Sequence, residues 1–156
     1  MPTAICGWVS RENGFRLMDF EQALLFLHKA KEIGRQKETL VSVAIVDAAG
    51  HPVLVARGKP EAWHGPYMAT GKARLSAAFR KPTGVLVKLW EDRPLYANSL
   101  NDVIPGGVTL NPGGYPIFEN GVCIGAIGVG GNKPSIDDEI ARLTIEAMGA
   151  GPDADK

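Results

Sequence analysis

The sequence predicts an α/β protein of the α+β type, in which an antiparallel sheet carries helices on both faces. Two pairs of apolar segments are each joined by a short turn, which is the pattern of a β-hairpin. The strands of these hairpins are almost continuously apolar, as is typical of strands covered on both faces. Segments with helical periodicity precede, separate and follow the hairpins. Because hairpins build antiparallel sheets, these helices are expected to lie on the faces of the sheet.

The composition is that of one globular domain. The chain has 156 residues, of which 45% are hydrophobic and 22% are charged, and its 17 Lys and Arg balance its 17 Asp and Glu. Without a basic excess, a role on nucleic acid or on a membrane surface has no electrostatic support. No segment is long and apolar enough to span a bilayer, and no secretory signal is apparent near the N-terminus. We therefore expect a cytoplasmic protein.

Three parts of the chain are expected. Residues 1–18 form an N-terminal arm, with a short strand or an irregular segment near Ile5 to Val9, residues 19–149 form a single domain, and residues 150–156 form a flexible tail. Cys6 and Cys123 are too few for a disulfide framework and lack the spacing of metal ligands. Cys123 lies in an apolar strand, where a buried thiol is expected.

The first half of the domain contains a helix and a hairpin. A helix is expected from Asp19 to Arg35, because Asp19 can cap it and an apolar stripe runs along it to Gly34. The following hairpin consists of Leu40 to Val46 and Pro52 to Ala56, with turn residues between them.

The middle of the chain is expected to be helical and then irregular. The segment from Ala62 to Phe79 is rich in small residues, so this helix can approach the sheet or a partner closely. Thr83 can cap a shorter helix that runs to about Trp90. Residues 91–112 are expected to be irregular, and irregular segments of this length are often binding loops.

A glycine-rich hairpin and a helix complete the domain. Asn120-Gly121 separates two apolar runs, which is the strongest short-range signal for a hairpin with a type I′ turn. The glycines between Gly125 and Gly131 loosely resemble a dinucleotide-binding loop, but no βαβ unit surrounds them. In the final helix, Ser135 and Asp138 have the spacing of a capping box.

The sequence contains no strong catalytic motif, but one group of residues favours a site. His64, Tyr67 and Lys72 lie within about two and a half turns around the start of the second helix, and helix N-termini favour anions. The alternative is that His64 is a solvated loop residue, Tyr67 a rim aromatic and Lys72 a surface charge.

Metal binding by histidines has little support. His28, His51 and His64 lie on separate expected elements, so only the folded chain could bring them together. His28 is expected either on the surface of the first helix or, in a second interpretation, as a metal or haem ligand.

Five motifs in order resemble the GlcG/HbpS family, which includes the C-terminal domain of PduO-type proteins. The resemblance covers roughly Asp19 to Met148. The motifs are Val43-Ala-Ile-Val-Asp-Ala-Ala-Gly50, Lys72-Ala-Arg74, Gly113-Gly-Tyr-Pro-Ile117, Gly121-Val-Cys-Ile-Gly-Ala-Ile-Gly-Val129 and Asp137-Asp-Glu-Ile-Ala141.

This resemblance implies a profilin-like fold with a central antiparallel sheet of about five strands. It also implies a homo-oligomer, from tetramer to octamer, and a role in haem binding, haem degradation or catabolism. By analogy with relatives, His28 on the first helix or Thr109 near the glycine-rich segment would bind haem as an axial ligand.

Three functions follow as hypotheses. The first is a protein that binds a small ligand, with haem as the implied cofactor. The second is a catabolic enzyme that acts on a small carboxylate or aldehyde, such as an intermediate of aromatic degradation. The third is a structural oligomeric module, and the sequence leaves open whether the protein is an enzyme.

The enzyme hypothesis assigns roles to particular residues. His64 would be a general acid or base, and Lys72 or Arg74 would hold an anion. Backbone amides from Gly113 to Tyr115 would polarise a carbonyl group. The remaining residues expected at the ligand are Tyr67, Gly114 and Pro116.

Overall fold

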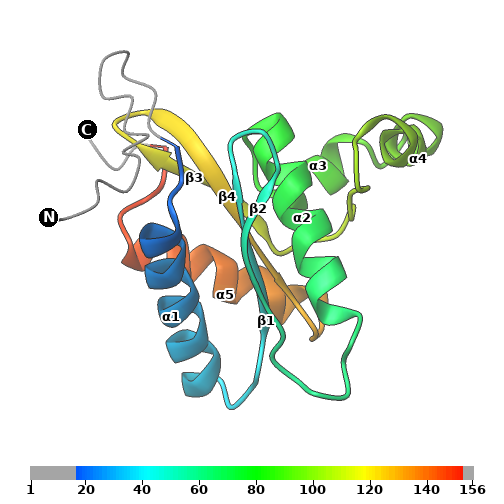
Figure 1. Cartoon of the computed structure of the whole chain (residues 1–156). Coiled ribbons are helices and arrows are strands. Elements are labelled where there is room, and N and C mark those ends of the chain that lie inside the picture. The colour runs from blue at the N-terminus through cyan, green and yellow to red at the C-terminus, as the bar shows by residue number, and fades with distance from the viewer. Residues whose placement is uncertain (1–16, 153–156) are drawn as a thin grey trace, which may run out of the picture.

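The computed structural model describes residues 17–152 and contains a four-stranded antiparallel sheet in the order β2-β1-β4-β3 (Figure 1). The strands are β1 (Ser42–Asp47), β2 (Pro52–Ala56), β3 (Gly114–Glu119) and β4 (Val122–Gly130). The α/β class and the antiparallel sheet are confirmed, but the expected count of about five strands is wrong for this part of the chain. The segment near Ile5 to Val9, where a short strand or an irregular segment was expected, lies outside the described residues.

Both predicted hairpins are confirmed, and their turns have the expected chemistry. In the β1–β2 turn, Asp47 Oδ1 accepts hydrogen bonds from the amides of Ala49 and His51, both at 2.9 Å. In the β3–β4 turn, Asn120 and Gly121 have φ angles of 49° and 72°. Two consecutive positive φ angles are what a type I′ turn requires.

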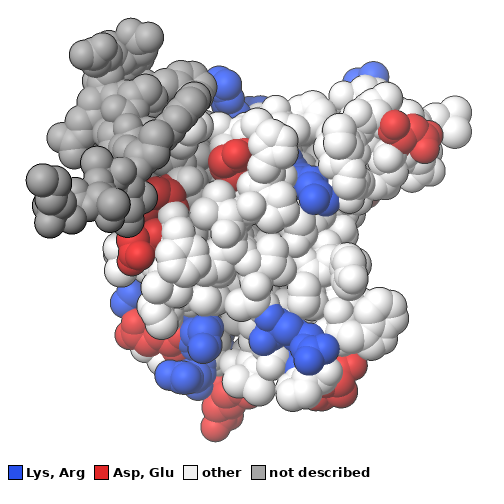
Figure 2. Space-filling model, viewed as in Figure 1, with Lys and Arg blue, Asp and Glu red and all other residues white. Residues whose placement is uncertain are grey.

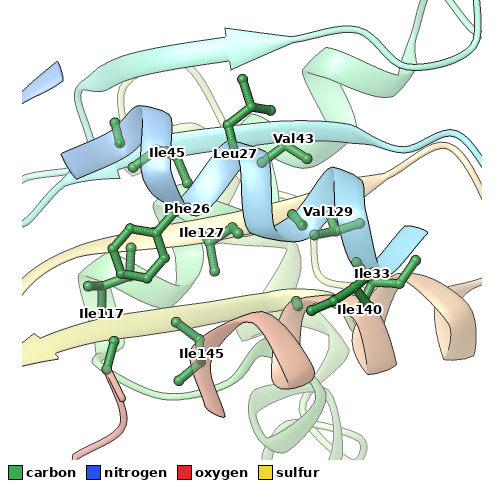
Figure 3. Packing of buried hydrophobic residues seen from close by; sticks show 14 of the residues in the cluster. Phe26, Leu27, Ile33, Val43, Ile45, Ile117, Ile127, Val129, Ile140 and Ile145 are labelled. Carbon is green, nitrogen blue, oxygen red and sulfur yellow. The ribbon is translucent and has the colours of Figure 1, made fainter. Parts of the chain in front are cut away.

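Helices α1 (Phe20–Gln36) and α5 (Pro134–Ala147) cover one face of the sheet. Branched and aromatic side chains from both helices interlock there with β1, β3 and β4, including Phe26, Val43 and Ile127 (Figure 3). Asp19 caps α1 as expected, in a capping box with Gln22. This face is a conventional core, in which large apolar side chains fill the space between helix and sheet.

The expected ends of two other segments are corrected. The capping box at Ser135 and Asp138 is wrong, because α5 begins at Pro134 and Lys133 is its N-cap, without a side-chain cap. Proline at the first position removes one amide that would otherwise need a partner. In the segment expected to be a tail from residue 150, Ala150 is buried and its carbonyl accepts a hydrogen bond from the Phe118 amide at 2.9 Å, so this residue belongs to the packed domain.

Helix α2 (Gly65–Phe79) covers the opposite face, and its contact with the sheet consists of small residues. Ala69 and Ala73 of α2 lie against Ala44 and Ala126 of the sheet. A Cβ atom on Gly128 would overlap the carbonyl oxygen of Ala69. The backbones of α2 and β4 therefore lie closer together than most side chains would allow, as the small residues of this helix predict.

Two short helices follow α2, namely α3 (Thr83–Leu89) and α4 (Pro94–Val103), and α4 projects from the body of the molecule (Figure 1). The expectation of an irregular segment over residues 91–112 is thus wrong for α4. Pro94 at the helix start is the signal that could have identified it. The Trp90 ring contacts the Phe79 and Tyr96 rings edge to face, with centroids 4.8 and 5.2 Å apart. This aromatic cluster attaches α4 to α2.

A buried ion pair joins the two helical layers. Lys72 of α2 and Asp137 of α5 are each 1% exposed, and Lys72 Nζ lies 3.0 Å from Asp137 Oδ2. The same ammonium donates to the carbonyl oxygen of Val129 at 2.8 Å. Burial raises the pKa of Asp137, and the Lys72 ammonium opposes that change. No helix within residues 17–152 combines the length and apolar character needed to cross a membrane.

Gly128→Ala is expected to lower the free energy of unfolding by about 1–3 kcal/mol, because the added methyl group meets helix backbone that cannot rotate away. Urea denaturation followed by circular dichroism measures this change. Gly151→Ala is the control, since a Cβ atom there meets nothing within 4 Å. Equal stability of the two variants would contradict the close contact of α2 and β4.

Lys72→Met is expected to lower the free energy of unfolding by roughly 3–5 kcal/mol, because it leaves the Asp137 carboxylate buried without its cation. The double variant Lys72→Met/Asp137→Leu should recover much of that loss, since it removes both charges. Denaturation curves of the two variants and the parent protein test this. A double variant less stable than the single one would refute the explanation.

Candidate functional site

A groove with a volume of about 680 Å³ lies between β2 and α2, and we call it the α2 groove. Its wall residues on α2 recur at helical spacing, so their side chains lie on one side of the helix. The small residues of α2 face the sheet, and the groove therefore runs along its outer side. The groove is lined by Val55, Arg57, Trp63, Pro66, Tyr67, Thr70, Arg74 and Gly106.

Two exposed aromatic rings form a corner of the α2 groove. Trp63 is 67% exposed and Tyr67 is 74% exposed. Their ring centroids are 6.3 Å apart and the ring planes meet at 76°. Exposed large aromatic side chains in contact with each other leave apolar surface in water, which is typical of a ligand or partner site.

Two arginines supply positive charge to the same groove. Arg74 Nη1 donates to the carbonyl oxygen of Gly106 at 2.7 Å, which fixes the guanidinium group in place. Gly106 has a φ angle of 79°, and a Cβ atom there would lie 2.6 Å from Arg74 Cζ. Glycine at this position therefore permits the contact. Within residues 17–152, neither Arg57 nor Arg74 forms an ion pair.

Some of the predicted site residues come together at this groove. His64 is the exposed N-cap residue of α2, and its ring centroid lies 5.9 Å from that of Trp63. Tyr67 and Arg74 line the groove itself. Lys72 does not reach it, because its ammonium is buried against Asp137. The alternative interpretation of Lys72 as a surface charge is wrong for the same reason.

The predicted site residues Gly113 to Pro116 lie elsewhere. The Gly114 amide donates to Thr83 Oγ1 at 2.9 Å, and a Cβ atom on Gly114 would lie 2.5 Å from the Lys72 carbonyl oxygen. Pro116 is buried in β3. These backbone groups serve the packing of β3 against α2, and none of them lines the α2 groove.

Tyr115 belongs to the other face of the sheet. Its side chain packs against the core formed with α1 and α5, and its hydroxyl donates to Asp138 Oδ2 at 3.2 Å. Burial, together with the Asp138 carboxylate, raises the pKa of Tyr115 to about 12. This phenol therefore stays protonated at neutral pH.

The two residues expected to bind haem lie far apart in the fold. His28 is exposed on α1, whereas Thr109 lies against Gly71 of α2, on the opposite face of the sheet. His51 is exposed beside Asp47, with 3.3 Å between Nδ1 and Oδ2. In the described part of the chain, no group of three or more His, Cys, Asp or Glu could hold a metal ion.

Most of the residues that line the α2 groove were not predicted from the sequence. Trp63, Pro66 and Thr70 could have been found from the helical spacing of Trp63, Tyr67, Thr70 and Arg74. Val55 and Arg57 could not, because only the packing of β2 beside α2 brings them to this place.

Comparison with known proteins places this architecture in a family. The family described as haem degrading protein HbpS-like matches residues 18–146. The crystal structure of HbpS has a TM-score of 0.74 and 27% identity, covering 85% of this chain and 91% of that one. The haem complex of PduOC has a TM-score of 0.74 and 28% identity, covering 88% of this chain and 99% of that one.

One curated relative is much longer than this chain. The corrinoid adenosyltransferase PduO of Salmonella typhimurium is 27% identical over 143 residues, which is 91% of this chain and 42% of that relative. The chain thus spans less than half of PduO. Its fold and its sequence over residues 18–146 show that the chain belongs to the HbpS-like family.

Proposed function

We propose that the protein binds a flat, anionic small molecule in the α2 groove. The observation that carries this proposal is the combination of exposed rings at Trp63 and Tyr67 with two arginines that have no acidic partner in the described structure. Aromatic rings stack on flat apolar groups, and guanidinium groups bind carboxylates in bidentate geometry. Such a site combines apolar walls with a few charged groups that fix orientation, as ligand pockets commonly do.

Haem is the first ligand to test, because a relative with 28% identity was solved as a haem complex. Haem has a flat apolar macrocycle and two carboxylates, and the α2 groove offers partners for both. The macrocycle would stack on one of the two rings, Trp63 or Tyr67, and meet the edge of the other, and Arg57 and Arg74 would hold the carboxylates. Bound haem would supply a redox-active iron.

His64 is the histidine placed to approach a ligand in the α2 groove, since its ring contacts the Trp63 ring. His28, the ligand implied by the resemblance, lies exposed on α1, and α1 covers the other face of the sheet. The two histidines therefore mark two separate surfaces. Their separate substitution decides which surface holds haem.

Titration of the purified protein with hemin is expected to give a saturable Soret shift, and His64→Ala should change the position of the bound Soret band. His28→Ala is the matched control on the opposite face and should leave the band unchanged. Absorption spectra of the three proteins measure this. Loss of the bound Soret band in His28→Ala alone would indicate that haem binds at α1. An absorbance that rises linearly with hemin, without a Soret shift, would refute haem binding.

A second function is favoured by the position of His64. An exposed imidazole lies at the N-terminus of α2, next to a groove in which Arg74 can hold an anion. Imidazole transfers protons effectively near neutral pH. We therefore also propose an enzyme that acts on a small carboxylate, with His64 as general acid or base and without a role for Lys72.

The enzyme hypothesis predicts catalysed proton exchange at a carbon next to a carbonyl group. Phenylpyruvate in D₂O is expected to lose its benzylic protons faster with the protein than without it. His64→Ala should lower the catalysed rate by about 100-fold or more, the contribution typical of a general base. Proton NMR measures the exchange, and His51→Ala is the control. Equal rates for the parent and His64→Ala would exclude His64 from the chemistry.

A further inference from the structure

The angle between the two aromatic rings restricts the shape of a ligand in the α2 groove. The Trp63 and Tyr67 planes meet at 76°, and the Trp63 and His64 planes meet at 86°. A single flat ring can stack on one of these rings while the edge or face of the next one closes the corner. An extended plane cannot stack on both, since two nearly perpendicular rings share no common parallel surface. The corner therefore suits one aromatic ring better than a macrocycle.

The guanidinium group of Arg74 is held in one position in the α2 groove. Arg74 Nη1 is held by the Gly106 carbonyl at 2.7 Å, with the Gly107 carbonyl at 3.5 Å. A guanidinium group has five N–H donors, so most of the Arg74 donors stay available after this contact. The Gly106 and Gly107 carbonyl oxygens carry no formal charge, so they do not neutralise the positive charge of Arg74. The group that completes this arrangement is a carboxylate, which accepts two parallel hydrogen bonds from a guanidinium.

The corner and the arginine lie on the same side of α2. Trp63, Tyr67, Thr70 and Arg74 follow one another at helical spacing along the α2 groove. The surface over β2 and α2 is mostly uncharged, with some Lys and Arg and some Asp and Glu side chains on it (Figure 2). A ligand along this line would meet apolar rings at one end and a cation at the other. The Thr70 hydroxyl already donates to the Pro66 carbonyl at 2.7 Å, so it adds little polarity of its own.

We propose that the α2 groove binds a small aromatic carboxylate, with its ring in the corner of Trp63 and Tyr67 and its carboxylate on Arg74. This inference rests on the proposed function of the groove and names the class of ligand. With a volume of about 680 Å³, the groove has room for a substituted ring or for a ring with a short acidic chain. Arg57, at the rim, adds to the attraction of an anion.

The test compares cinnamate with its uncharged amide, cinnamamide, by isothermal titration calorimetry. Cinnamate is expected to bind about tenfold or more tightly than cinnamamide, because only the acid forms charge-assisted hydrogen bonds with Arg74. Trp63→Ala and Arg74→Met should each lower the affinity for cinnamate by about tenfold or more. Phe20→Ala and Arg35→Met, which change exposed residues of α1 on the opposite face, are the matched controls and should bind like the parent.

The outcomes separate this inference from the proposed function. Equal affinity for cinnamate and cinnamamide, or unchanged affinity in Trp63→Ala, would overturn the inference. Hemin binding that Trp63→Ala weakens, without cinnamate binding, would also overturn it while the function of the groove stands. If neither hemin nor cinnamate binds, both proposals fail. Thermal melting of Arg74→Met confirms that this variant is folded before its affinity is interpreted.

Discussion

The close contact between α2 and β4 is the constraint on which the other features of this protein depend. Gly128 has no room for a Cβ atom beside the Ala69 carbonyl, so helix and sheet meet backbone to backbone. All the large apolar residues of the main core are therefore on the other face, under α1 and α5. On the side of α2 that faces away from this contact, Tyr67 and Arg74 line the α2 groove together with Trp63, which precedes the helix.

The burial of Lys72 is a consequence of this close packing, and the fold supplies partners for its charge. A lysine on the inner side of a closely packed helix loses its water, and a buried ammonium without an anion would be strongly unfavourable. Asp137 at the start of α5 and the Val129 carbonyl provide its partners. The ion pair thereby links helices on opposite faces of the sheet. Lys72 is therefore buried in the fold, whereas Arg74, two residues further along α2, lines the α2 groove.

Much of the fold follows from local sequence patterns, but the candidate site follows only in part. Asn120-Gly121, the capping residue Asp19 and the small residues of α2 predicted a hairpin, a helix and a close contact, and all three are present. His64, Tyr67 and Lys72 were predicted together because they lie within about two and a half helical turns, and Arg74 was predicted as the alternative to Lys72 for holding an anion. Lys72 was grouped with them because sequence distance does not show on which side of a helix the core lies.

The sequence by itself determined the elements, the hairpin turns and the family, since turn geometry, capping and periodicity act between residues close in the chain. The tertiary structure alone decided which surface carries the groove. Val55 and Arg57 of one strand segment meet Trp63 and Arg74 there only because β2 lies beside α2. It also decided that Gly113 and Gly114 serve packing, since the Lys72 and Thr83 atoms they contact are far away in sequence. Contacts of this kind depend on the whole fold, so no local pattern encodes them.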